Sequence, residues 1–109
     1  MQILVTGITG RIGANLAAQL VHRGHSVRGL VWDRDRRTEK LRGLGVELVE
    51  GSLTQLRHVE AAVAGVDAVY HLGAAFQGGG PFSTDDYFEI NLRGTYHMLE
   101  ACRLSSVSP

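Results

Sequence analysis

The fold of this chain is decided by residues 6–13, which read TGITGRIG and lie between two different periodicities. Residues 3–5, just before them, are a short apolar run of β-favouring residues, typical of a buried strand. Residues 12–23, just after them, carry apolar side chains at helical spacing, and Gly24 is well placed to end that helix. The sequence therefore predicts a strand, a glycine turn and a helix in immediate succession.

Each glycine of this turn has a physical role. Gly7 allows a sharp turn off the strand, Gly10 leaves room for a pyrophosphate to approach the backbone, and Gly13 lets the helix pack close to the sheet. The exposed amides and the dipole at the start of the helix favour a diphosphate. A glycine-rich turn without a ligand is the alternative. The turn lacks the Gly-Lys-Ser/Thr ending of ordinary nucleoside triphosphatases, which excludes that class.

The rest of the chain repeats the alternation of strand and helix. We expect strands at 27–32, 46–49 and 68–72, and helices at 34–44, 53–65 and from about 84 to 103, with a loop at 78–81. Such alternation produces right-handed crossovers and a parallel sheet. We therefore predict an α/β fold, a Rossmann-like half-domain whose four strands lie in the order 3-2-1-4 with flanking helices. On the last helix we expect the following side chains to pack: Tyr87, Ile90, Leu92, Tyr96, Leu99 and Cys102.

Composition excludes further classes of function. The chain has 109 residues, enough for one domain, with 11 basic and 11 acidic side chains. This balance gives no overall field that would attract nucleic acid or an anionic membrane, so we expect neither as a partner. The single cysteine excludes an internal disulfide, no Cys/His cluster has metal-ligand spacing, and no apolar run is long enough to cross a bilayer. We expect a cytoplasmic protein.

Five segments of the chain form an ordered set: TGITGRIG (6–13), GHSVRGLVWD (24–33), VELVEGSL (46–53), DAVYHLGAA (67–75) and INLRGTYHMLEAC (90–102). Together they cover nearly the whole chain. The set resembles the extended short-chain dehydrogenase/reductase family, which comprises the nucleotide-sugar epimerases, dehydratases and their reductase relatives. The resemblance implies that the chain binds NAD(H) or NADP(H).

The resemblance also assigns residues to parts of the dinucleotide. The residues expected near the diphosphate are Gly7, Thr9, Gly10, Arg11, Ile12 and Gly13. Those expected near the adenosine are Trp32, Asp33, Arg34, Ser52 and Leu53. Those expected near the ribose on the nicotinamide side are Leu72, Gly73, Ala74, Ala75 and Asn91. In the family Asn91 supports the catalytic helix and its water network, and a helix residue bonded to neighbouring backbone is the alternative for it.

Two departures from the family concern the cofactor. The family commonly has Asp where this chain has Ser52, and serine is shorter and neutral, so we expect a weaker or water-mediated hold on adenine. Val31 stands where an acidic residue would bind the ribose hydroxyls. A basic run follows at 34–37, and nearby arginine accommodates a 2′-phosphate. These residues favour NADP(H), with NAD(H) and a solvated basic face as the alternatives.

A third departure concerns catalysis. The family uses a Tyr-x-x-x-Lys pair, but none of the three tyrosines here has a lysine four residues later, and Lys40 is the one lysine in the sequence. We assign no catalytic residue, favour a structural role for His71, and expect a half-domain that ends before a fifth strand and does not catalyse alone. Whether it is an enzyme stays open. The alternative is a non-catalytic binding module or a folding fragment with a vestigial site. An exposed fourth strand predicts a homodimer through that edge.

Overall fold

A computed structural model of the chain describes residues 1–32, 37–74, 83–105 and 107. Its strands are β1 (Gln2–Thr6), β2 (Ser26–Val31), β3 (Glu47–Glu50) and β4 (Ala68–His71). Its helices are α1 (Arg11–His22), α2 (Glu39–Gly43), α3 (Leu56–Val63), α4 (Thr84–Phe88), the π-helical turn η1 (Glu89–Arg93) and α5 (Gly94–Leu104). The strands form one parallel sheet in the order β3-β2-β1-β4, which confirms the predicted fold class and strand order.

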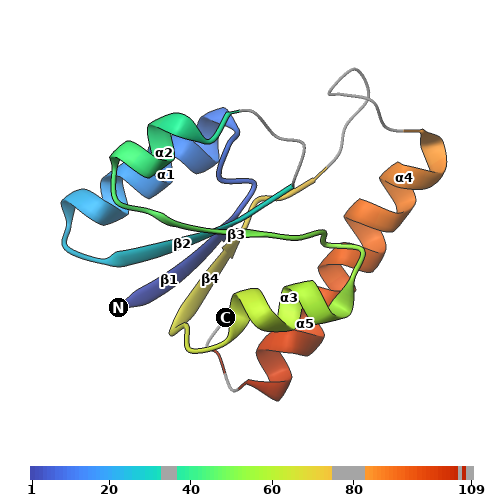
Figure 1. Cartoon of the computed structure of the whole chain (residues 1–109). Helices are drawn as coiled ribbons and strands as arrows, with labels where there is room; N and C mark the ends of the chain where they lie inside the picture. Colours follow the sequence, from blue (N-terminus) through green and yellow to red (C-terminus); the bar gives the residue numbers. More distant parts are fainter. Residues whose placement is uncertain (33–36, 75–82, 106, 108–109) are drawn as a thin grey trace.

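The sheet is covered on both faces (Figure 1), with α1 and α2 on one side and α3 and α5 on the other. Alternation along β1 produces this division, since Ile3 and Val5 pack with the helices of the first face and Leu4 packs with those of the second. A strand covered on both faces is apolar at consecutive positions. The run at 3–5 is apolar for this reason. No helix in the described ranges is long and apolar enough to span a membrane.

The second predicted helix is much shorter than expected. We predicted a helix over 34–44, whereas α2 occupies Glu39–Gly43, and residues 33–36 lie outside the described part of the chain. In this helix Leu41 is the one buried residue. A helix of this length is stabilised by packing rather than by its own hydrogen bonds, and the described residues 37 and 38 before it form a turn. The loop predicted at 78–81 also lies outside the described residues.

The last helix begins as predicted but contains a π-helical turn. Ser83 caps it in a reciprocal capping box, in which the Ser83 hydroxyl accepts from the Asp86 amide and the Asp86 carboxylate accepts from the Ser83 amide. The turn η1 then adds one residue to the helical repeat and rotates the following face by about 100°.

The structure corrects part of the predicted packing face. We expected Leu92, Tyr96 and Leu99 to pack, but they are 59%, 63% and 67% exposed. The buried residues of α5 are instead Gly94, His97, Met98 and Ala101. The prediction was therefore wrong for Leu92, Tyr96 and Leu99, whereas Cys102 packs partly buried against the core, as expected.

Arg28 connects the sheet to the end of α3. It lies opposite Glu47 in the register of β2 and β3, and its Nε donates to the Glu47 carboxylate at 2.8 Å. Its Nη1 donates to the carbonyls of Ala62 at 2.8 Å and Ala64 at 2.6 Å, where α3 ends. The Arg28 side chain is 16% exposed and that of Glu47 is 58% exposed. Arg28 therefore binds helix-terminal carbonyls that have no partner within the helix.

We expect Arg28→Met to lower the free energy of unfolding by about 2 kcal/mol, because hydrogen bonds to a charged group contribute about 1.5–3 kcal/mol. Methionine keeps most of the apolar stem and removes the donors. Glu47→Gln, which weakens the exposed ion pair and leaves both carbonyls bonded, should cost less than about 1 kcal/mol. Urea unfolding followed by circular dichroism measures both variants. Equal losses would show that the carbonyl contacts contribute nothing.

Candidate functional site

The glycine turn packs backbone against backbone. Gly7 has a φ of +66°, and a Cβ there would lie 2.7 Å from the carbonyl group of Leu72 and 2.8 Å from the amide nitrogen of Gly73. A Cβ on Gly13 would overlap the carbonyl oxygen of Gly7. Gly7 and Gly13 are therefore required by the structure itself: one brings the turn against the segment that follows β4, and the other brings α1 against the turn.

Gly10 differs from these two glycines. A Cβ there would meet only the Gly7 carbonyl, at 3.4 Å, which is an ordinary contact. Gly10 is the N-cap of α1, where its carbonyl accepts from Ala14 at 2.9 Å, and as a glycine it supplies no side-chain cap. The amides of the first turn therefore have no intrahelical acceptor. Arg11 and Ile12 are exposed beside them, and Thr9 is half-buried within the turn.

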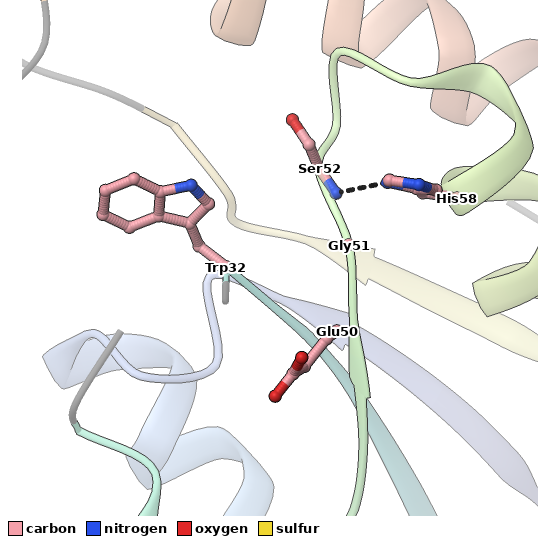
Figure 2. Close-up of a pocket in the computed structure, with 5 residues that line it drawn as sticks. All are labelled: Trp32, Glu50, Gly51, Ser52 and His58. Carbon is pink, nitrogen blue, oxygen red and sulfur yellow. Dashed lines mark hydrogen bonds between the residues drawn. The ribbon is translucent and has the colours of Figure 1, made fainter. Parts of the chain in front are cut away.

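A pocket of about 360 Å³ lies at the ends of β2 and β3. Its lining residues are Trp32, Glu50, Gly51, Ser52 and His58. Figure 2 shows Trp32 at the end of β2 and the imidazole of His58 directed from α3 toward the backbone of Ser52. The strands of the sheet are parallel, so this pocket and the glycine turn lie at the same carboxyl edge. Ligands of open parallel sheets bind at this edge.

Ser52 is held by bonds within its own loop. Its amide donates to Nδ1 of His58 at 3.0 Å, and its hydroxyl accepts from the Thr54 amide at 3.2 Å and lies 2.7 Å from the Thr54 hydroxyl. Because Nδ1 accepts, neutral His58 carries its proton on Nε2. Glycine is required at position 51, where a Cβ would lie 2.9 Å from Cβ of His58. The loop thus presents a short hydroxyl and an imidazole together.

Leu53 joins this loop to the segment after β4. A Cβ on Gly73 would lie 3.0 Å from Cδ1 of Leu53, and a Cβ on Gly94 would lie 2.8 Å from Cβ of Leu53. The carbonyl of Leu53 accepts from Nδ1 of the buried His97 at 2.8 Å. Two glycines and a buried histidine therefore fix Leu53 between the sheet edge and α5.

A chain of hydrogen bonds crosses from β1 to the π-helical turn. The Thr6 hydroxyl accepts from the Gly73 amide at 2.9 Å and lies 2.7 Å from Nδ1 of His71. Nε2 of His71 lies 3.2 Å from the Thr95 hydroxyl, which donates to the carbonyl of Asn91 at 2.7 Å. Burial lowers the pKa of the His71 imidazole below its ordinary value of 6.5. This chain satisfies polar groups in a partly buried region.

The structure therefore brings together most of the residues expected at the site. Glycines 7 and 13, Leu72, Gly73 and Leu53 form one packed unit, while Trp32 and Ser52 line the pocket. Ala74 is exposed just beyond Gly73, and Asn91 lies in the π-helical turn. Asp33, Arg34 and Ala75 lie outside the described residues. The part of all the predicted site residues in cofactor binding stays a prediction.

Sequence reasoning did not identify three of the pocket residues, Glu50, Gly51 and His58. Glu50 lies one residue beyond the strand expected at 46–49, and His58 lies within the helix expected at 53–65. The available signal was their position in the sequence. Glu50 lies within the segment 46–53 that resembles the adenine-binding turn, and His58 follows that segment. Among the described residues, no three His, Cys, Asp or Glu side chains gather as a possible metal site.

Comparison with known proteins gives a consistent result. Residues 3–108 match the model of the NAD dependent epimerase/dehydratase family. The chain is 42% identical to a 2-alkyl-3-oxoalkanoate reductase of Stenotrophomonas maltophilia, over 98% of this chain and 31% of that protein. It is 36% identical to a 3 beta-hydroxysteroid dehydrogenase/Delta 5→4-isomerase of Mycobacterium tuberculosis, over 97% of this chain and 29% of that protein. The chain thus spans about a third of the length of the curated relatives it matches.

Solved structures are similar over the same region. A short-chain dehydrogenase/reductase superfamily protein from Agrobacterium tumefaciens, with bound NAD, has a TM-score of 0.80 and 37% identity. The match covers 98% of this chain and 30% of that one. The UDP-glucose 4-epimerase of Thermus thermophilus, in complex with NAD, has a TM-score of 0.78 and 29% identity, over 99% of this chain and 35% of that one.

The lowered pKa of His71 predicts a pH dependence of stability. Above pH 6.5 the imidazole is neutral in both folded and unfolded chains, so titration contributes nothing there. As the pH falls below 6.5, the unfolded chain binds a proton that the folded chain resists, and stability falls.

We expect the stability of the wild-type chain, measured relative to His71→Gln, to decline as the pH drops through this range. Urea unfolding at several pH values measures it. His22→Gln, at an exposed position, controls for the loss of one histidine. A difference between wild type and His71→Gln that does not vary with pH would contradict the prediction.

Proposed function

Because this chain belongs to the NAD dependent epimerase/dehydratase family, we propose that its glycine turn binds the diphosphate of a nicotinamide dinucleotide and that the neighbouring pocket binds the adenosine. The observation that carries the proposal is the start of α1. Gly10 leaves the first turn of that helix without a side-chain cap, at the carboxyl edge of a parallel sheet and beside an open pocket. Uncapped amides and the helix dipole together favour an anion.

The adenosine half of the proposal rests on the pocket. A volume of about 360 Å³ is sufficient for a nucleobase with part of its ribose, and a small-molecule site is usually a concave cavity of about 300–1,000 Å³. Trp32 offers an aromatic face, while Ser52 and His58 offer polar groups that can fix the orientation of a heterocycle. Glu50 and Ser52 are the acceptors available for an exocyclic amino group.

The charges around the pocket bear on the choice between NAD(H) and NADP(H). Arginines at 34, 36 and 37 support NADP(H), as the sequence predicted, and two of these lie outside the described residues. The Glu50 carboxylate, which lines the pocket, supports NAD(H), because it would repel a 2′-phosphate. Bound NAD in the similar structures described above supports NAD(H) as well. Titration with both dinucleotides decides between them.

The activity of the chain by itself is proposed to be binding without turnover. We propose that residues 1–109 form one dinucleotide-binding unit of an epimerase- or oxidoreductase-type protein. The resemblance requires a tyrosine followed four residues later by lysine, and the sequence contains no such pair. A non-catalytic Rossmann-type module with a vestigial site is the second candidate, and dinucleotide affinity distinguishes the two.

We expect the purified chain to bind NAD(H) or NADP(H) in the micromolar range in a calorimetric titration. Gly10→Val should weaken binding by at least about tenfold, because a side chain at the start of the helix takes the space of the diphosphate. Gly43→Val in α2 is the matched control, since a Cβ there meets nothing within 4 Å. Its affinity should equal that of the wild type.

Unfolding curves of both variants show whether the fold is retained. A folded wild-type chain that binds neither dinucleotide would overturn the proposed function. The glycine turn would then have an architectural role alone.

We also propose a homodimer in which two copies pair through β4. The support is topological: β4 is an edge strand of the sheet that the described residues form, and Tyr70 on it is 44% exposed. An open apolar edge strand favours pairing with another chain. A twofold axis would place the two β4 strands side by side in one continuous sheet.

We expect a dimeric sedimentation mass at tens of micromolar and a monomeric mass for Tyr70→Lys, because a charge on an edge strand opposes pairing. Tyr96→Lys, on the exposed face of α5, is the matched control and should stay dimeric. A monomeric wild type would contradict the dimer. Dissociation by Tyr96→Lys alone would move the interface to α5.

A further inference from the structure

The chain of hydrogen bonds through His71 lies at the point where the strand order of the sheet reverses. β2 and β3 follow β1 on one side of it, whereas β4 lies on its other side. Thr6 and His71 are the paired last residues of β1 and β4. In open α/β sheets, ligands bind in the crevice at the carboxyl ends of the strands where the order reverses. His71 is therefore beneath the crevice in which the proposed dinucleotide would lie.

The hydrogen bonds fix the position of each proton in this chain. The Asn91 carbonyl can only accept, so the Thr95 hydroxyl donates to it. The Thr95 oxygen must then accept from Nε2 of His71, at 3.2 Å. A neutral imidazole protonated on Nε2 has an acceptor at Nδ1, and Nδ1 accepts a hydrogen bond from the Thr6 hydroxyl at 2.7 Å. The Thr6 oxygen remains able to accept from the Gly73 amide.

We propose that His71, held as its neutral Nε2–H tautomer, is a positioning residue that sets the floor of the dinucleotide crevice by fixing the segment after β4 against the glycine turn. The inference rests on the proposed function and extends it to a residue that touches neither phosphate nor adenine. Through Thr6, His71 fixes the amide of Gly73, and Gly7 packs directly on that amide group. Through Thr95, it fixes the backbone of the π-helical turn at Asn91.

Loss of the His71 imidazole would act first on Thr6 and on the backbone that Thr6 bonds. Thr6 is 1% exposed, and an apolar side chain at position 71 would leave its hydroxyl without this acceptor. The nearest groups affected are the closely packed backbones of Gly7, Leu72 and Gly73, at the end of the crevice proposed to hold the diphosphate and the second ribose. The adenosine pocket is formed by other residues at the ends of β2 and β3. The effect of His71 should therefore be confined to one end of the ligand.

The test compares three ligands that occupy increasing lengths of the crevice: AMP, ADP-ribose and NAD⁺. We expect His71→Phe to weaken binding of ADP-ribose and NAD⁺ by about tenfold, the value of roughly one hydrogen bond, and to change AMP binding by less than about twofold. His71→Gln, whose amide offers one acceptor and one donor, should recover most of the affinity. His22→Phe, at an exposed position on α1, should match the wild type for all three ligands.

Nitrogen-15 spectra of the wild-type imidazoles provide a second readout that needs no ligand. We expect the His71 ring to be neutral with its proton on Nε2. A proton on Nδ1, or an equal loss of affinity for all three ligands in His71→Phe, would overturn the positioning role and leave the proposed function intact. Failure of the wild-type chain to bind any of the three ligands would overturn the proposed function instead, and the crevice assigned to His71 with it.

Discussion

The structure depends on a close approach between two pieces of backbone. The turn after β1 lies directly on the segment after β4, and Gly7, at a φ of +66°, leaves no space for a side chain between them. Gly13 imposes the same constraint in the first turn of α1, where it packs on the backbone of Gly7. Any other residue at these positions would push the helix away from the sheet edge, because a side chain cannot share space with backbone. The orientation of α1, and hence of its amides, follows from these two contacts.

Polar groups near this contact are satisfied by a small set of side chains from distant parts of the sequence. Thr6, His71 and Thr95 come from β1, β4 and α5, and together they bond two backbone groups, the Gly73 amide and the Asn91 carbonyl. A network of this kind is favourable when each member has a partner and costly when one is lost. His97 has a similar role for the loop after β3, where it bonds the carbonyl of Leu53. The backbone segments of the site are thus held in place by two histidines, His71 and His97.

Much of the fold could be predicted from the sequence because the residues that determine it lie close together along the chain. The three glycines at 7, 10 and 13 and the apolar run at 3–5 specify a strand, a turn and a helix without reference to the rest of the chain. The repeated alternation then specifies a parallel sheet and its order. The packing face of α5 could be predicted only in part, because apolar side chains occur on more than one side of this helix. Tyr96 and Leu99, expected to pack, are exposed, whereas Met98 and Ala101 are buried.

The same distinction, between features set by local sequence and features set by packing, applies to the candidate site. Residues whose role follows from backbone geometry, such as Gly7 and Gly13, are identifiable from spacing because no other side chain would fit. Residues such as Glu50 and His58 are brought to the pocket by the packing of a loop against α3, and only their position in or near the segment 46–53 indicates them in the sequence. Gly10 belongs to neither group, since the fold leaves room for a side chain there. At the start of α1 that room is available to the diphosphate that we propose binds there, and the helix dipole favours its negative charge.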